Sequence, residues 1–269
     1  MATLSSLLAT ALSLALSALP ARAQEDAKSE RIVLNRDRHG PLVMQVAPKD
    51  AAPDVPFLIL LHESRSSRGE YQPILPRLHE LGYATLNVDL SAGMECREVK
   101  NLTARKAAEV GRTPTFLDSQ RDIADAVLWA RANRAHGKLV LVGSGYSAGL
   151  ALVHAAEHPD LVDGVVAFSP SEVFASLGKP ETWVLDSARA LEIPIWISSA
   201  RAEEKDWRPI FEAIQSQKKV SFLPEGPGLH GARALWPENK GSELYQAALE
   251  LFLKEHFPLP KPPETPAGG

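Results

Sequence analysis

The chain has 269 residues, of which 45% are hydrophobic and 23% charged, and its formal net charge at pH 7 is −4. This composition is typical of a globular protein with a sizeable core, and chains of this length often form one domain of alternating helices and strands. The sequence has no long basic run and no interleaving of basic and aromatic residues, so nucleic acid and acidic membrane surfaces are not expected partners.

The first residues, MATLSSLLATALSLALSALPARAQ, form an uncharged Leu/Ala/Ser run followed by Ala21-Arg22-Ala23. A small residue on each side of Arg22 is the pattern that a signal peptidase accepts. The sequence therefore predicts a signal peptide over residues 1–23, cleavage after Ala23 and export to the periplasm or the medium. An uncleaved anchor is the alternative, although the apolar run is short for a membrane span.

Cys96 is the only cysteine, so no disulfide can form within the chain and stability must come from burial of a core. Neither C-x-x-C nor H-E-x-x-H spacing is present, and the eight histidines are scattered. We therefore expect no metal site and no cofactor.

The segment from Ile32 to Val46 predicts an antiparallel hairpin around His39-Gly40-Pro41. From Val55 onward, short apolar runs alternate with amphipathic stretches, which is typical of an α/β fold. We expect a mostly parallel twisted sheet of about eight strands, with helices on both faces, because strands buried on both sides read as continuous apolar runs. The predicted strands are VPFLILL, YATLNV, KLVLVG, DGVVAF, PIWISS and VSFL, and the clearest helices are Asp118 to Ala132 and Ser242 to His256.

Two connections bear on function. The connection from Leu90 to Leu117 is long for a compact domain and predicts a loop that covers a site. The segment from Pro170 to Ile193 is too short for a large cap domain and predicts one helix, Glu181 to Leu191. The expected domain spans residues 24–257, and PLPKPPETPAGG, residues 258–269, is too rich in proline and glycine for a regular element and predicts a disordered tail.

The motif Gly145-Tyr146-Ser147-Ala148-Gly149 lies between the KLVLVG strand and a helix that includes LALVHAAEH. A serine in such a strand-to-helix turn projects above the carboxyl ends of the strands, and the glycines relieve crowding there. Ser147 is the predicted nucleophile of this elbow. The Ala148 amide, at the start of the helix, is the predicted oxyanion donor.

The glycines Gly143, Gly145 and Gly149 also resemble a dinucleotide-binding loop. That site needs an acidic residue at the end of the next strand. The GVVAF strand ends in Ser169-Pro170 instead, so the hydrolytic interpretation is favoured.

A serine nucleophile needs a histidine base and a carboxylate that orients it, in the chain order Ser, acid, His on this kind of sheet. His230 follows the VSFL strand in the glycine-rich loop PEGPGLHG and is the predicted base, whereas His256 lies in the last helix. The acid is expected after the PIWISS strand. The candidates there are Glu203, Glu204 and Asp206, of which Glu203 is favoured and Asp206 is better explained as a helix N-cap.

A second oxyanion donor is expected in the loop after VPFLILL, where the amide of Ser64 is the first candidate and that of Glu63 the second. The carboxylate of Glu63 so near a nucleophile requires a partner, Arg65 or Arg68, or has a direct role. A surface salt bridge is the alternative.

Together these features resemble the α/β-hydrolase fold, from about Val55 to about Phe257. The stretch PFLILLHESRSSRGEYQPILPRLHELGYATLNVDLSAG is similar to dienelactone hydrolases, with His62-Glu63 in place of a Gln-Glu pair, followed by Gly82-Tyr83 and Asp89. That family uses a cysteine nucleophile whose thiolate is controlled by the glutamate. This chain has Ser147 instead, so Glu63 is either a relic of ancestry or has a changed role.

The resemblance implies a serine hydrolase that cleaves carboxylic ester or lactone bonds without a cofactor. His230 would deprotonate Ser147, an acyl-enzyme would form, the amides of Ala148 and Ser64 would hold the oxyanion, and Glu203 would orient His230. The alternatives are a serine peptidase of the same fold and a non-catalytic binding protein.

Basic residues in the long connection can attract an anionic substrate, although a solvated basic face is the favoured interpretation. They are Arg97, Lys100, Arg105, Lys106 and Arg112. The same connection holds the sequon Asn101-Leu102-Thr103, which matters only in a host that glycosylates exported proteins. The sequence does not indicate an oligomeric state.

Overall fold

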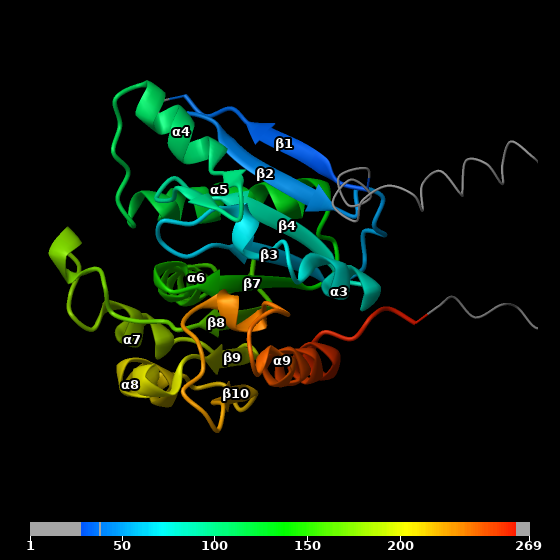
Figure 1. Cartoon of the computed structure of the whole chain (residues 1–269), viewed down its shortest axis with the longest axis vertical. Helices are drawn as coiled ribbons and strands as arrows, with labels where there is room; N and C mark the ends of the chain where they lie inside the picture. Colours follow the sequence, from blue (N-terminus) through cyan, green and yellow to red (C-terminus); the bar gives the residue numbers. More distant parts are fainter. Residues whose placement is uncertain (1–27, 38, 262–269) are drawn as a thin grey trace, which may run out of the picture.

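The computed structural model of the protein describes residues 28–37 and 39–261, and its centre is an eight-stranded sheet of order β1-β2-β4-β3-β7-β8-β9-β10 (Figure 1). From β4 to β10 neighbouring strands in this order run parallel, whereas β2 is antiparallel to β4 and β1 is antiparallel to β2. The mostly parallel sheet and the leading hairpin are therefore confirmed. The strands are β1 (Glu30–Leu34), β2 (Leu42–Ala47), β3 (Phe57–Leu61), β4 (Ala84–Asp89), β7 (Leu139–Ser144), β8 (Gly164–Phe168), β9 (Ile195–Ser198) and β10 (Lys219–Phe222).

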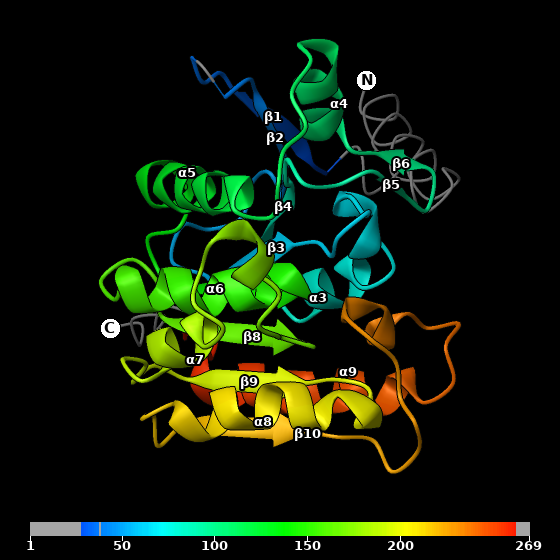
Figure 2. The same ribbon diagram turned by 90° about the vertical axis from the view of Figure 1, so that its left-hand side faces the viewer.

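Helices cover both faces of the sheet. One face packs against α5, α6, α7 and α8, and the other against α3 and α9, so that Figure 2 shows α5, α6 and α8 in front of the strands and α9 behind them. The helices are α3 (Leu75–Glu80), α4 (Leu102–Glu109), α5 (Asp118–Asn133), α6 (Tyr146–Glu157), α7 (Trp183–Ala188), α8 (Glu204–Ala213) and α9 (Ser242–His256), with short 3₁₀ turns η1 (Arg68–Glu70), η2 (Ala175–Leu177), η3 (Arg201–Glu203) and η4 (Ala232–Leu235).

The two cores lie on opposite sides of the strands, because side chains alternate along each of them. In β3, Ile59 belongs to the core under α5 and α6, while Leu58 and Leu60 belong to the core under α3 and α9. All five residues of β3 are buried, which explains why the sequence shows a continuous apolar run there.

The connection between β4 and α5 has more structure than the predicted loop. It holds a two-stranded hairpin, β5 (Glu95–Cys96) and β6 (Val99–Lys100), and the helix α4. Asn101 is the N-cap of α4 and accepts a hydrogen bond from the Ala104 amide at 2.8 Å. By contrast, the segment between β8 and β9 holds only η2 and α7, so the expected absence of a large cap agrees with the structure.

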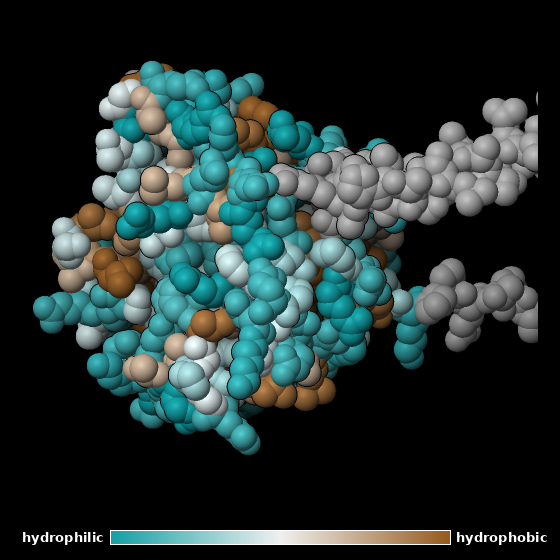
Figure 3. Space-filling view, in the orientation of Figure 1, coloured by the Kyte–Doolittle hydropathy of each residue, from teal (hydrophilic) through white to brown (hydrophobic). Residues whose placement is uncertain are grey.

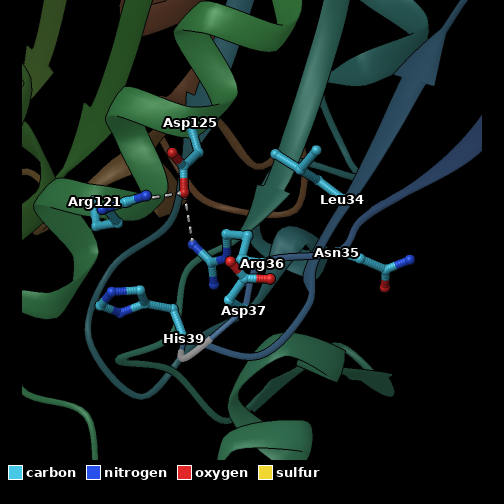
Figure 4. Close-up of a pocket in the computed structure, with 7 residues that line it drawn as sticks. All are labelled: Leu34, Asn35, Arg36, Asp37, His39, Arg121 and Asp125. Atoms are coloured by element: carbon cyan, nitrogen blue, oxygen red, sulfur yellow. Dashed lines mark hydrogen bonds and ion pairs between the residues drawn. The ribbon is translucent and has the colours of Figure 1, made fainter.

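The hairpin β1-β2 is tied to α5 by a buried ion pair next to a polar pocket of about 480 Å³ (Figure 4). The Arg36 guanidinium lies 2.6 Å from a carboxylate oxygen of Asp122 and 3.3 Å from one of Asp125. Asp122 also accepts the Ser91 N–H at 2.6 Å. Arg121 lies 3.4 Å from the same oxygen of Asp125, so two cations balance two carboxylates and we assign the cluster a structural role in fixing where the long connection begins.

The predicted signal peptide (1–23) lies outside the described residues, as does most of the predicted tail, residues 262–269. In the described ranges, no helix has the length and apolarity needed to cross a bilayer. The surface in Figure 3 is mostly hydrophilic, with apolar residues in small separate patches.

Candidate functional site

The strand-to-helix turn is present, but its central residue is Gly145 rather than Ser147. Strand β7 ends at Ser144, α6 begins at Tyr146, and Gly145 between them has φ 58° and ψ −121°. Glycine adopts a positive φ without the steric cost that a side chain incurs. A Cβ placed on Gly145 would lie 1.4 Å from Oε2 of Glu63. The point at which a nucleophile would project from this turn is therefore occupied by the Glu63 carboxylate.

The prediction that Ser147 is the nucleophile is wrong in this structure. Ser147 is fully buried in the first turn of α6. Its Oγ lies 2.8 Å from the Leu61 carbonyl oxygen and 2.9 Å from that of Ser144, and it accepts the Ser144 N–H at 3.0 Å. The hydroxyl thus joins α6 to the ends of β3 and β7 and has no contact with His230.

The predicted oxyanion donors also need correction. The Ala148 N–H donates to the Gly145 carbonyl at 3.0 Å, and Ala148 is fully buried. The Ser64 N–H donates to Oε1 of Glu63. The amide directly after the turn is that of Tyr146, which, as the first residue of α6, has no acceptor within the helix. The N–H group of Tyr146, unlike that of Ala148, is therefore a free backbone donor at this helix N-terminus.

Glu63, His230 and Glu203 form a continuous hydrogen-bonded row. Nε2 of His230 lies 2.8 Å from Oε2 of Glu63, and Nδ1 lies 2.7 Å from Oε1 of Glu203. The His230 side chain is 42% exposed, compared with 13% for Glu63 and 26% for Glu203, so the row opens to solvent at the histidine. The structure brings the predicted base and acid together, and it identifies His230, rather than Arg65 or Arg68, as the partner of Glu63.

Two carboxylates on one imidazole determine its charge. Hydrogen bonds from the ring to Glu203 and then to Glu63 raise the pKa of His230 to about 10, although burial opposes this. Burial acts to raise the pKa of Glu203, but its hydrogen bonds with His230 and Ser169 outweigh burial and hold that pKa below its ordinary value. At neutral pH, His230 is therefore an imidazolium and donates from both nitrogens.

Among the three candidate acids, only Glu203 contacts His230 in the structure. Glu204 forms an ion pair with Arg208, one turn further along α8. Asp206 lies in the first turn of α8, whose N-cap is Glu203, so the interpretation of Asp206 as the N-cap is wrong. The positions of Glu204 and Asp206 are therefore explained without a role in the functional site.

Several supporting residues were missed by the sequence analysis. Glu70 is buried beneath the row and accepts the Glu63 N–H and the Ser144 hydroxyl, each at 2.6 Å. Ser144 Oγ in turn accepts the Ala232 N–H at 2.9 Å. Burial raises the pKa of Glu70. Its carboxyl thus joins the loops that carry Glu63, Gly145 and His230.

Ser169, at the end of β8, plays a similar part on the other side of His230. Its hydroxyl donates to Oε2 of Glu203 at 2.7 Å and accepts the Gly231 N–H at 2.9 Å. Its φ of 52° is unusual for a residue with a side chain, and such strain concentrates at functional sites.

The neighbouring residue His62 fixes the backbone of Glu63. Its Nε2 accepts the Leu90 N–H at 2.9 Å, so this nitrogen carries no proton, and Nδ1 donates to the Glu63 carbonyl at 2.7 Å. Asn101, fully buried, lies 3.1 Å from the same Nε2 and donates to the Leu90 carbonyl at 2.8 Å. The side chain of the sequon is thus part of the packing behind the site.

The shifted titration of His230 predicts how stability changes with pH. Its pKa is raised by folding, so its contribution to stability is complete below about pH 6.5 and is lost as the pH rises towards about 10. We expect the melting temperature of the wild type to fall between pH 7 and pH 10 by several degrees more than that of His230→Gln, measured by circular dichroism.

The matched control is His136→Gln, a change of the same kind at an exposed histidine, which should keep the wild-type slope. Parallel curves for the wild type and His230→Gln would contradict the imidazolium assignment.

Within residues 28–37 and 39–261, no group of three His, Cys, Asp or Glu side chains is arranged to hold a metal ion. In the row itself, both nitrogens of His230 already face carboxylates. The row and the adjoining turn thus present two carboxylates, an imidazolium and the N–H group of Tyr146.

Comparison of the sequence with models of known families and with curated proteins gives no match. Solved structures do match. A dienelactone hydrolase from Anabaena variabilis has a TM-score of 0.61 at 17% identity, covering 86% of this chain and 99% of its own. The esterase Pf2001 of Pyrococcus furiosus has a TM-score of 0.65 at 17% identity, covering 85% and 93%. Est1E from Butyrivibrio proteoclasticus has 0.60 at 14%, covering 84% and 98%. The chain has the α/β-hydrolase fold, which confirms the predicted fold class.

Proposed function

We propose that the protein hydrolyses carboxylic esters or lactones by direct attack of water, with Glu63 in the place where this fold commonly carries a nucleophile. The observation that supports this most strongly is the Glu63–His230–Glu203 row next to Gly145. It keeps the histidine and acid of a triad and adds a carboxylate within 2.8 Å of the imidazole. This mechanism does not use Ser147 as the nucleophile, because its side chain is fully buried.

The chemistry follows from the charges of the three groups. A water molecule beside Glu63 loses a proton to its carboxylate while the water oxygen bonds to the ester carbonyl carbon. Negative charge develops on the carbonyl oxygen, which the Tyr146 N–H stabilises. The tetrahedral intermediate then collapses, the carbon–oxygen bond to the alcohol breaks, and Nε2–H of His230 protonates the leaving alkoxide.

One proton transfer restores the site. After the reaction Glu63 holds the proton taken from water and His230 has given one to the alcohol, so both groups are neutral. Their atoms lie 2.8 Å apart, so the proton can pass directly from Oε2 of Glu63 to Nε2 of His230. Glu203 stabilises the regenerated imidazolium throughout.

The activities named for several structural neighbours agree with this reaction class. They include a dienelactone hydrolase, an esterase and a monoacylglycerol lipase on the same fold. A shared fold at 14–17% identity does not establish a shared substrate. The proposed reaction class therefore rests on the Glu63–His230–Glu203 row.

The test is hydrolysis of p-nitrophenyl acetate and dihydrocoumarin by purified protein after exposure to a fluorophosphonate. We expect turnover to survive the reagent, mass spectrometry to find no adduct on Ser147, and stopped-flow traces to show no burst of p-nitrophenol. A stoichiometric burst or an adduct would support an acyl-enzyme. An absence of hydrolysis above buffer would contradict the hydrolase proposal.

The second candidate is a non-catalytic protein that binds a small molecule at this site. Gly145 favours it, because the turn lacks the hydroxyl or thiol of a covalent mechanism. Binding of an ester without turnover, detected by ligand-observed NMR, is the result that would support it. A serine peptidase is not proposed, since Ser147 is inaccessible.

A further inference from the structure

A pocket of about 410 Å³ is lined by Ser64 and Arg65, which directly follow Glu63 in the chain, and the long connection between β4 and α5 forms most of its wall. This volume falls within the range of about 300–1,000 Å³ that is usual for small-molecule sites. The lining includes Ser64, Arg65, Met94, Ala104, Ala108, Arg112 and Phe116.

The pocket is physically joined to the proposed catalytic groups. Ser64, in its wall, donates its N–H to Glu63. The ring of Phe116 stacks on that of Tyr146 with centroids 4.3 Å apart, and the Tyr146 hydroxyl lies 3.2 Å from the Ala92 carbonyl oxygen. The pocket is therefore connected to Glu63 through Ser64 and to the side chain of Tyr146 through Phe116 and Ala92.

Apolar atoms dominate the inner wall. Ala104 and Ala108 are four residues apart on α4 and share one face of that helix. Met94 is 58% exposed, and a thioether side chain adapts to ligands of different shape. Two cations, Arg65 and Arg112, also line the pocket. Arg112 donates a hydrogen bond to the His39 carbonyl and forms an ion pair with Asp118. An uncharged apolar group thus matches most of the lining.

We propose that this pocket binds the apolar substituent of the ester, and that Ala104 and Ala108 set the largest substituent it accepts. The inference rests on the proposed function and adds a substrate class to it: esters with one uncharged apolar chain of medium length or one aryl group. Short and compact esters would leave the wall of α4 in contact with water.

The test varies the chain length on each side of the ester. In a pH-stat, kcat/KM is measured for methyl esters from acetate to hexanoate and for acetates from methyl to hexyl. We expect kcat/KM to rise about two- to fourfold per methylene in one of the two series. A flat dependence in both series would overturn the proposal.

Ala108→Trp supplies the matched variant, because Ala108 lies on the exposed side of α4 outside the catalytic row. It should lower kcat/KM for the longest ester of the responsive series by about tenfold or more, and lower kcat/KM for methyl acetate by a smaller factor. Ala132→Trp, the same change at an exposed alanine of α5, should leave both values unchanged. Equal effects of the two variants would contradict the assignment.

A substrate with a charged chain tests whether the pocket recognises an apolar group or, through Arg65, an anionic one. If monomethyl adipate is hydrolysed better than methyl hexanoate, the pocket selects charge and the proposal is overturned.

A binding measurement tests the pocket independently of catalysis. The ketone isostere 3-octanone should give saturation-transfer NMR signals with the wild type and Ala132→Trp and much weaker ones with Ala108→Trp, even if no ester is hydrolysed. Equal signals from all three would overturn the pocket assignment alone.

Discussion

The double variant Gly145→Ser/Glu63→Ala should react with a fluorophosphonate at position 145, whereas the wild type should give no adduct at any serine of the site. In the wild type the turn carries no side chain, and the Glu63 carboxylate fills the space a hydroxyl would need. Removing that carboxylate leaves Nε2 of His230 free to accept a proton from the new hydroxyl. Glu203 continues to hold Nδ1 at 2.7 Å. Fluorophosphonate labelling followed by peptide mass spectrometry is the measurement.

The two substitutions are expected to work only together. Gly145→Ser alone places a Cβ 1.4 Å from Oε2 of Glu63, so the carboxylate must move or the protein loses stability. The backbone of Gly145, with φ 58° and ψ −121°, adds a cost of roughly 1–3 kcal/mol for a residue with a side chain. Glu63→Ala alone has no nucleophile at the turn.

Ser147→Ala, added to the double variant, tests which serine reacts. It removes buried hydrogen bonds and is expected to cost about 1–3 kcal/mol of stability without abolishing labelling. Labelling that disappears with Ser147→Ala, or an adduct on wild-type Ser147, would contradict the assignment of Gly145 as the nucleophile position.

Glu63→Gln should lower kcat for ester hydrolysis by about 10²- to 10⁴-fold, the usual contribution of one general acid–base group. The amide has the shape of the carboxylate and can still accept the Ser64 N–H, but it cannot take a proton from water. The measurement is steady-state hydrolysis of p-nitrophenyl acetate near pH 7.

Glu225→Gln is the matched control, since Glu225 is exposed in the loop that carries His230 and contacts neither Glu63 nor Glu203 in the described hydrogen bonds. It should retain wild-type activity. Full activity in Glu63→Gln would eliminate Glu63 as the base, and equal losses in both variants would show that the loss is not specific to the Glu63 carboxylate.

The sheet was predictable because its strands are buried on both faces and therefore read as uninterrupted apolar runs. Helix α4 was not predicted, since LTARKAAE is only 8 residues long and buries only Thr103 and Ala107. The helix begins at the Asn101 N-cap. Asn101 is also the asparagine of a sequon, so the sequence alone does not distinguish a helix cap from a glycosylation site.

At the site, chain order correctly paired His230 with Glu203, because both follow the ends of parallel strands that meet at one edge of the sheet. The predicted centre of the turn, Ser147, lies two residues after the observed centre, Gly145. The small residues Gly143 and Ser147 flank the turn. Gly145, between them, has no side chain that could act as a nucleophile, so no sequence motif marks it as the centre of the turn. Ser147 is small and lies where the helix approaches β3, which explains its type without catalysis. Contacts such as Glu70 with Ser144 join segments far apart in the chain, so no local pattern indicates them.

The buried position of Asn101 has a consequence for producing the protein. Its amide nitrogen lies against the Leu90 carbonyl and His62, and its carbonyl oxygen caps α4. An oligosaccharide on that nitrogen is incompatible with the folded chain, so in a secretory pathway that modifies sequons, sugar transfer competes with folding. A molecule that acquires the sugar first loses the wall of the pocket and the support behind Glu63, while production without glycosylation avoids this competition.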